Sequence, residues 1–190
     1  MFDKSSNQYY YCNMMKLADK FKNKNIVLVG FMACGKTFTS RELAVRLKRE
    51  RVSTDELIVA REKRSIADIF AQSGEPYFRQ IERDVVRECA GRTGLVIDCG
   101  GGVAASDENF NALKATGISF YLNASPEAIH RRTQGKTDRP LLNVDDPMSK
   151  IQELLARRDP YYRKADHIVD SSEDNIPKVV DEILRILQAQ

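Results

Sequence analysis

The segment from Gly30 to Thr37 has the residue types and the spacing of a phosphate-binding loop. It reads GFMACGKT, follows an apolar run and matches the pattern GxxxxGK[ST]. Gly30 and Gly35 allow the backbone to curl, so that successive N–H groups and the positive end of the following helix face a phosphate. Lys36 would neutralise the outer phosphates, and the Thr37 hydroxyl can hold magnesium. The sequence therefore predicts binding of ATP or a close relative, with transfer of its terminal phosphate to a small molecule.

The residues of this loop and its flank are the first predicted nucleotide contacts. They are Gly30, Met32, Ala33, Cys34, Gly35, Lys36, Thr37 and Phe38. Cys34 lies near a helix N-terminus among amides, which favours its thiolate. We therefore expect oxidation of Cys34 to impair ATP binding, and bound ATP to protect the thiol from alkylation.

Two further charged residues stand where phosphoryl transfer would need them. Asp55 follows the second predicted strand, where a carboxylate can accept hydrogen bonds from acceptor hydroxyls and orient or deprotonate the attacking one. The alternative role for Asp55 is the N-cap of the next helix. Arg139 lies in a polar segment, and a cation that arrives only on closure would stabilise charge on the transferring phosphoryl group. The alternative for Arg139 is a solvated loop charge.

The elements that position these residues follow from the apolar pattern. From Asn25 onward, strand-like runs alternate with helical patterns, which is typical of βαβ units and a parallel sheet covered on both faces. The predicted strands are Ile26 to Val29, Val52 and Ser53, Leu95 to Ile97, Ile118 to Leu122, and His167 to Val169. The predicted helices are Lys36 to Arg49, Asp55 to Lys63, Ile66 to Gln72, Pro76 to Cys89, Asp107 to Ala115, Pro126 to Arg132, Pro147 to Arg158 and Ile176 to Leu187.

Two stretches interrupt this alternation. The triple glycine from Gly100 to Gly102 directly follows a strand, at the carboxyl edge where open α/β sheets bind ligands. The polar segment 134–146 is long enough to form a mobile lid.

Residues 1–24 show no periodic pattern and are predicted to be an N-terminal extension, either disordered or carrying a short helix around Met15 to Phe21. The kinase-like domain would then span residues 25–190.

Length and composition restrict the class of protein. A chain of 190 residues suits one α/β domain, and 30 basic against 27 acidic residues are too balanced to indicate nucleic-acid or membrane binding. No window approaches a membrane-spanning helix, and the N-terminus lacks the apolar core of a secretory signal, so we expect a cytoplasmic location. The four cysteines show neither zinc-ligand nor disulfide spacing. We also expect a monomer.

From Asn25 nearly to the C-terminus, the chain resembles the shikimate kinases, a branch of the P-loop folds related to nucleoside-monophosphate kinases. Besides the loop, the matching motifs are Ser53-Thr54-Asp55, Phe78-Arg79-xx-Glu82, Gly100-Gly101-Gly102, Arg139-Pro140-Leu141-Leu142 and Arg158-Asp159-Pro160-Tyr161-Tyr162. The resemblance implies a three-layer α/β/α fold with a five-stranded parallel sheet in the order 2-3-1-4-5 and a lid. It also implies ATP and Mg2+ as cofactors and shikimate as the small-molecule substrate.

The resemblance also assigns roles to individual residues. Lys36, Asp55 and Arg139 would be catalytic, and Arg132, Arg139 and Pro177 would join the nucleotide contacts. The substrate contacts would be Asp55, Arg79, Glu82, Gly100, Gly101, Gly102 and Arg158. Arginine matches a carboxylate with planar bidentate donors, and Glu82, three residues after Arg79 on a predicted helix, can hold it in position. An exposed ion pair is the alternative for Arg79 and Glu82.

The sequence departs from the family's pattern at two places. Ser53 replaces the first aspartate of its D-S/T-D motif, so a charged partner for magnesium is missing and the Ser53 hydroxyl is left as a candidate magnesium contact. Asp98 ends an apolar strand, where P-loop enzymes in general carry a magnesium-associated acid, and we expect Asp98 to take that outer-shell role; capping of the glycine turn is the alternative. Ala33 replaces a glycine of the loop and resists positive φ, so we expect a slightly altered loop geometry.

The expected activity is ATP-dependent phosphorylation of the 3-hydroxyl of shikimate. One alternative is a kinase of another small polyol acid such as gluconate. Arg79, Arg158 and the triple glycine argue against that acceptor. The second alternative is a nucleotide-binding paralogue without turnover, which Ser53 and the tyrosine-rich extension favour.

Overall fold

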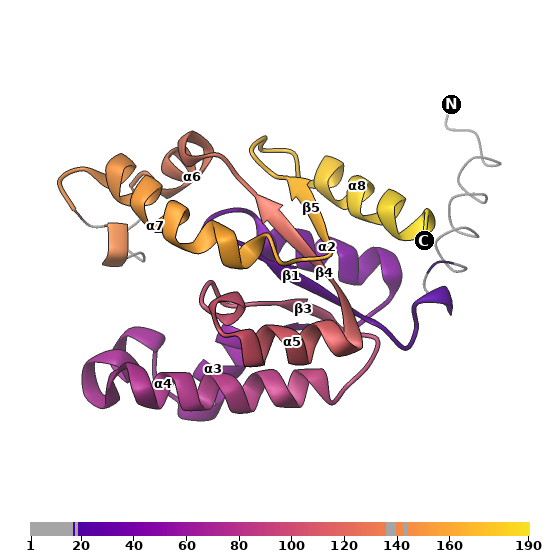
Figure 1. Ribbon diagram of the computed structural model, residues 1–190, viewed down its shortest axis with the longest axis horizontal. Helices are drawn as coiled ribbons and strands as arrows, with labels where there is room; N and C mark the ends of the chain where they lie inside the picture. Colours follow the sequence, from indigo (N-terminus) through magenta and orange to yellow (C-terminus); the bar gives the residue numbers. More distant parts are fainter. Residues whose placement is uncertain (1–16, 18, 136–139, 143) are drawn as a thin grey trace.

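The fold is built around one parallel β-sheet. The computed structural model describes residues 17, 19–135, 140–142 and 144–190 (Figure 1). Its strands are β1 (Asn25–Val29), β2 (Arg51–Ser53), β3 (Val96–Asp98), β4 (Gly117–Asn123) and β5 (His167–Asp170). All neighbouring pairs are parallel, in the order β2-β3-β1-β4-β5, which confirms the expected sheet. Every residue of β1 is buried, as a central strand covered on both faces requires.

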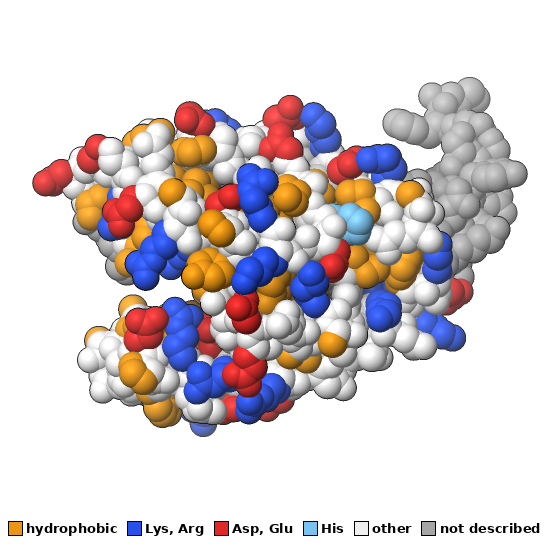
Figure 2. Space-filling model, in the orientation of Figure 1, with side chains coloured by type: hydrophobic (Ala, Val, Ile, Leu, Met, Phe, Trp, Pro, Cys, Tyr) orange, Lys and Arg blue, Asp and Glu red, His pale blue; other side chains and the backbone are white. Residues whose placement is uncertain are grey.

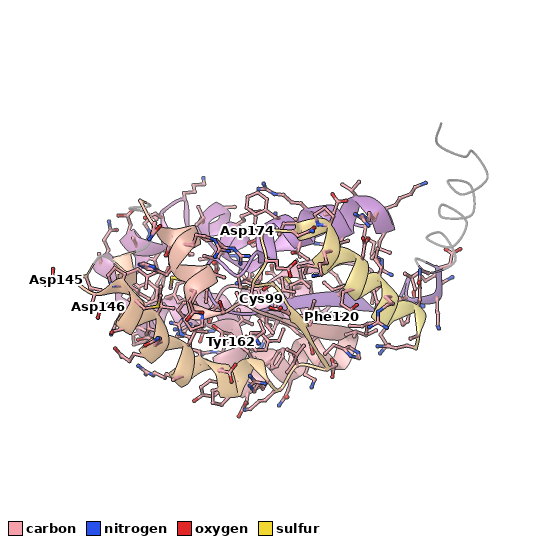
Figure 3. The ribbon with its side chains drawn as sticks, turned by 90° about the horizontal axis from the view of Figure 1, so that it is seen from above. Cys99, Phe120, Asp145, Asp146, Tyr162 and Asp174 are labelled. Atoms are coloured by element: carbon pink, nitrogen blue, oxygen red, sulfur yellow. The ribbon has the colours of Figure 1, made fainter. Side chains whose placement is uncertain are left out.

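Helices cover both faces of the sheet. They are α2 (Lys36–Leu47), α3 (Thr54–Glu62), α4 (Ile66–Ala90), α5 (Asp107–Thr116), α6 (Pro126–Thr133), α7 (Pro147–Tyr162) and α8 (Ile176–Gln188). Helices α2 and α8 lie together on one face, and α5 and α7 lie on the other (Figures 1 and 3). The result is the three-layer α/β/α arrangement that was expected.

Side-chain caps set where most of these helices begin. The hydroxyl of Ser53 accepts a hydrogen bond from the backbone N of Glu56, three residues into α3. Equivalent caps are made by Ser65, Ser106, Ser125, Asp146 and Asn175. Asp55 is therefore not the N-cap of α3 but lies in its first turn.

The long helix α4 contains a break that the sequence had indicated. Gly74 has φ 79° and ψ 171°, and Pro76 follows it, so two helical segments meet here at an angle. The predicted helices Ile66 to Gln72 and Pro76 to Cys89 are thus confirmed as the two arms of α4. Two short 3-10 turns, η1 (Val103–Ala105) and η2 (Pro140–Leu142), were not predicted, because three residues give no periodic signal.

The N-terminal region falls largely outside the described residues. Within it, Leu17 and Phe21 are buried in the hydrophobic core, although both belong to the predicted extension. The part of the chain that the structure describes contains no helix long and apolar enough to cross a membrane.

Candidate active site

The phosphate-binding loop joins β1 to α2 and has the left-handed conformations that its glycines were expected to supply. Gly30 has φ 146° and Gly35 has φ 101°. A Cβ on Gly30 would lie 2.7 Å from the carbonyl oxygen of Leu122, so a side chain at position 30 is excluded by space as well as by conformation. Gly35 is the N-cap of α2, and the free N–H groups of the first turn of α2 face the loop.

Ala33 also adopts a left-handed conformation, with φ 58°. The expectation that alanine would resist positive φ and alter the loop is therefore corrected: the loop imposes the conformation on Ala33. A non-glycine residue there costs on the order of 1 kcal/mol, which the surrounding loop must offset.

Lys36 is half-buried and folded back onto its own loop. Its Nζ donates to the carbonyl oxygens of Gly30 and Phe31, both at 2.9 Å, and lies 3.7 Å from Sγ of Cys34. Burial works to lower the pKa of Lys36, but the nearby groups of Cys34 and Asp98 raise it overall. The ammonium therefore stays charged in the loop and is available for phosphate oxygens.

Cys34 is fully buried beneath the loop. Its sulfur would lie 2.9 Å from a Cβ on Gly30, so the thiol fills the space that this glycine leaves. Cys34 lies near the N-terminus of α2, as expected from the sequence. Because the thiol is buried, this structure does not support its expected accessibility to alkylating reagents. Two other nucleotide candidates differ in exposure: Met32 is half-buried and Phe38 is 65% exposed.

Arg132 connects the loop to the segment between β5 and α8. Its guanidinium donates to the carbonyl oxygens of Ala33 at 3.2 Å and Ser171 at 2.7 Å, and to Oδ1 of Asp174 at 2.7 Å. Asp174 lies near the start of α8 (Figure 3). The structure thus places Arg132 against the phosphate-binding loop, and its contact with the nucleotide stays a prediction.

Pro177 begins the first turn of α8 behind the N-cap Asn175. The neighbouring Ile176 packs against the loop, since its Cδ1 would lie 3.4 Å from a Cβ on Gly35. Arg132 and the turn that carries Ile176 and Pro177 therefore both lie beside the loop, at Ala33 and Gly35. That Arg132 and Pro177 flank a base stays a prediction.

Where the loop enters α2, the Thr37 hydroxyl meets a buried carboxylate. Thr37 Oγ1 donates to Oδ2 of Asp98 at 2.9 Å, and Arg51 Nη2 donates to the same oxygen at 3.0 Å. Arg51 also makes a bidentate pair with Glu56 at 2.8 and 3.1 Å. Ser53, in contrast, caps α3, so its hydroxyl has a role other than the predicted magnesium contact.

The electrostatics of this cluster follow from its hydrogen bonds. The side-chain hydrogen bond from Arg51 lowers the pKa of Glu56, and in return the bonds to Glu56 and Asp98 raise the pKa of Arg51. Oxygen ligands suit magnesium, which is usually held by one or two carboxylates together with substrate phosphates. The donor set of Thr37 and Asp98 fits that pattern, and among the described residues no cluster of three or more metal-ligating side chains exists.

Each residue of the triple glycine faces one of the three side chains that were predicted to bind the substrate. A Cβ on Gly100 would collide with Oδ1 of Asp55, and one on Gly102 would lie 2.5 Å from Nη1 of Arg79. A Cβ on Gly101 would lie 3.5 Å from Nη1 of Arg158. None of the three glycines has a positive φ, so they are needed for close approach and not for conformation.

The prediction that Asp55, Arg79 and Arg158 meet at this turn is therefore supported by their positions in the structure. Figure 2 shows a cleft between α4 and the side formed by α7 and η2, with Lys and Arg side chains along its walls.

Arg79 is held between two carboxylates. Glu82 accepts from Nη1 at 2.9 Å, as the sequence predicted, and Glu75 accepts from Nε and Nη2 at 3.1 and 3.0 Å. The Glu82 side chain is 2% exposed and that of Glu75 is 62% exposed, so the first partner is fixed and the second can move into water. Burial raises the pKa of Glu82 against the opposing effect of Arg79.

Arg158 lies over the ring of Phe31, with its Cζ 5.7 Å from the ring centroid. Beside it, the hydroxyl of Tyr162 donates to the carbonyl oxygen of Gly101 at 2.7 Å. Burial raises the pKa of Tyr162, so the phenol stays neutral and keeps this hydrogen bond. In Figure 3, Tyr162 at the end of α7 is seen near the middle of the molecule.

Sequence reasoning missed four contributors to this site: Arg51, Thr54, Glu75 and Tyr162. Thr54 accepts a hydrogen bond from the backbone N of Gly100 at 2.8 Å and so fixes the glycine turn against α3. Thr54 and Tyr162 lie within motifs that were identified, and Arg51 and Glu75 lie two and three residues before one, which is the signal that could have found them. Arg139, the predicted lid arginine, lies outside the described residues.

Comparisons with known proteins agree with this geometry. A family model described as shikimate kinase matches residues 32–188. A curated shikimate kinase of Caldanaerobacter subterraneus subsp. tengcongensis is 41% identical over 162 residues, covering 85% of this chain and 95% of the relative. A solved shikimate kinase of Acinetobacter baumannii in complex with shikimate has a TM-score of 0.84 at 35% identity, covering 90% and 97% of the two chains.

A more distant structural neighbour is a gluconokinase of Sinorhizobium meliloti 1021, with a TM-score of 0.60 and 17% identity, covering 89% and 94% of the two chains. That likeness shows a shared fold alone. The family model, in contrast, spans residues 32–188, which contain most of the loop, the glycine turn, Arg79 and Arg158. The curated relative covers 85% of the chain. This chain belongs to the shikimate kinase family.

Proposed function

We propose that this protein transfers the γ-phosphate of ATP to the 3-hydroxyl of shikimate. The observation that carries the proposal is the glycine turn, where Gly100, Gly101 and Gly102 face Asp55, Arg158 and Arg79 beside a phosphate-binding loop. A carboxylate acceptor needs cationic donors and its hydroxyls need an acceptor group, and this turn offers both within a few ångströms.

In the proposed reaction, the protein acts by positioning and by stabilising charge. Arg79 and Arg158 bind the acceptor carboxylate, and Asp55 accepts a hydrogen bond from the attacking hydroxyl and orients it. Lys36 leaves the carbonyl oxygens of its own loop and moves to the phosphates. Arg139 is proposed to approach the transferring phosphoryl group when the lid closes.

The nucleotide would lie along the loop, with its base between Arg132 and Pro177. Magnesium would be held by the Thr37 hydroxyl, with Asp98 in its outer shell, and would neutralise charge on the phosphate oxygens. If so, replacing Asp98 by Asn should sharply raise the magnesium concentration required for activity. An unchanged magnesium titration would contradict the role of Asp98.

Two other functions remain to be separated by experiment. A kinase of another polyol acid such as gluconate shares the fold, but the pair of Arg79 and Arg158 at the glycine turn favours a cyclic carboxylate held at two points. A nucleotide-binding protein without turnover is the other. A coupled assay of ADP release with shikimate, with gluconate and with no acceptor distinguishes all three, because only the first function gives shikimate-dependent ADP.

We also propose that the active form is a monomer in the cytoplasm. The support is that the loop, the glycine turn and the arginines all come from one chain, so that no residue from a second copy is needed among those described. Sedimentation of the active enzyme under assay conditions tests the monomer directly.

A further inference from the structure

Arg51 is a half-buried arginine beside the phosphate-binding loop, and its hydrogen-bond partners lie on three different elements of the site. Its Nε donates to the hydroxyl of Ser40 on α2 at 2.9 Å, and its two terminal nitrogens bind Glu56 on α3. The remaining bond, from Nη2, goes to Oδ2 of Asp98 at the end of β3. The guanidinium is thereby fixed at several points, with little freedom to rotate.

The carboxylate that Arg51 binds depends on such a partner. The Asp98 side chain is only 6% exposed, and a buried carboxylate is costly unless it is paired and hydrogen-bonded. Asp98 is the register partner of Ser53 in the β2–β3 ladder, and Ser53 offers it no charge. Within this ladder, Arg51 is therefore the cation that holds Asp98.

Asp98 in turn sets the direction of the Thr37 hydroxyl. The hydroxyl has one proton, which it donates to Oδ2 of Asp98, so its lone pairs are left for a cation at the phosphates. Ser40 adds a second link between Arg51 and Thr37. Its hydroxyl accepts a hydrogen bond from Arg51 and donates one to the backbone carbonyl oxygen of Thr37 at 3.0 Å. Arg51, Asp98 and Thr37 form a chain of contacts that ends at the proposed magnesium site.

We propose that Arg51 is a positioning residue for the metal–nucleotide complex, which acts by holding Asp98 against Thr37. The inference rests on the proposed function for the location of the metal, and it adds a residue to which no role in metal binding had been given. Groups behind a metal ligand govern its orientation, and their loss typically weakens metal binding about 10- to 100-fold.

The test measures metal affinity and not turnover. Mn2+ binding to the enzyme–ADP complex, followed by electron paramagnetic resonance, should be weakened about ten-fold by Arg51→Gln. The affinity for metal-free ADP, measured by calorimetry, should change less than about two-fold, because the loop amides bind the phosphates directly. The matched control is Arg61→Gln, which removes an arginine of α3 that pairs with Glu88 at 2.6 Å, away from the loop. That variant should leave both affinities unchanged.

A double-mutant cycle separates positioning from general damage. If Arg51 acts through Asp98, then Arg51→Gln should weaken Mn2+ binding no further in the Asp98→Asn background. Additive losses, or an unchanged Mn2+ affinity in folded Arg51→Gln, would overturn the proposal. Should Arg51→Gln fail to fold, Arg51→Lys carries the same expectation, because lysine keeps the charge but loses the fork that reaches Ser40, Glu56 and Asp98 together.

Failure of the proposed function gives a different result. An enzyme that releases no ADP with shikimate, yet shows the Mn2+ pattern, refutes the shikimate assignment and leaves the role of Arg51 standing. Normal turnover with shikimate, together with an unchanged Mn2+ affinity in Arg51→Gln, refutes only the role of Arg51 and leaves the proposed function standing.

Discussion

The two halves of the site recognise their ligands by different means. On the nucleotide side, the loop offers backbone N–H groups and a half-buried Lys36 that donates hydrogen bonds to carbonyl oxygens of the same loop. On the acceptor side, recognition depends on side chains from three separate helices, Asp55 on α3, Arg79 on α4 and Arg158 on α7, which meet at the glycine turn. The first half is thus local in sequence, and the second is assembled by the fold.

This difference has a mechanical consequence. The loop conformation is fixed by glycines at positive φ and by close packing against Leu122, so the nucleotide half is rigid. In the acceptor half, Arg79 is 34% exposed and one of its two carboxylate partners can move into water. Changes in the loop should therefore affect phosphate binding as a whole, whereas changes at the turn should act on one acceptor contact at a time.

The strongest way to break the nucleotide half is to remove its cation. Lys36→Met should lower kcat/KM about 10²- to 10³-fold, because the phosphoryl group loses a preorganised positive charge. The free energy of unfolding should fall as well, because the groups of Cys34 and Asp98 that raise the pKa of Lys36 stabilise its charged form in the folded protein. Steady-state kinetics and chemical denaturation measure the two quantities, and a loss of activity below about ten-fold would contradict the role given to Lys36.

The acceptor half can be disrupted without touching a charged residue. Gly100→Ala places a methyl group against the Asp55 carboxylate and should lower kcat/KM for shikimate about 10²-fold by displacing it, while the affinity for ATP is kept. Gly101→Ala is the matched comparison, because its Cβ would meet Arg158 only at van der Waals distance, 3.5 Å. Equal losses in both variants would contradict the contact between Gly100 and Asp55 as the cause.

The same contrast explains what could be predicted from the sequence. The loop, the strands, the sheet order and the break at Gly74 were predicted, because each depends on a local pattern or on the family resemblance. The bond between Arg51 and Asp98 was not, because it joins residues 47 positions apart and depends on the register of β2 against β3. Ala33 was misjudged, because the packed loop overrides the intrinsic preference of alanine.

A smaller effect sharpens the view of the acceptor half. Glu75 occupies the Nε–Nη2 edge of Arg79, the edge that a substrate carboxylate would use, so the two compete. Glu75→Gln should lower KM for shikimate about two- to five-fold, the range of an exposed ion pair, and leave KM for ATP unchanged. The control is Glu182→Gln, which breaks the pair with Arg185 on α8. A raised KM would instead mean that Glu75 orients Arg79 for the substrate.

The smallest effect concerns strain in the rigid half. Ala33→Gly removes the cost of a left-handed alanine, on the order of 1 kcal/mol, but adds conformational entropy to the unfolded chain. We expect a net rise of about 0.5 kcal/mol in the free energy of unfolding, measured by urea denaturation. Ala156→Gly, at an exposed position within α7, should lower it by about 1 kcal/mol. If both substitutions destabilise the protein equally, Ala33 stores no strain, and the rigidity of the loop rests on Gly30 and Gly35 alone.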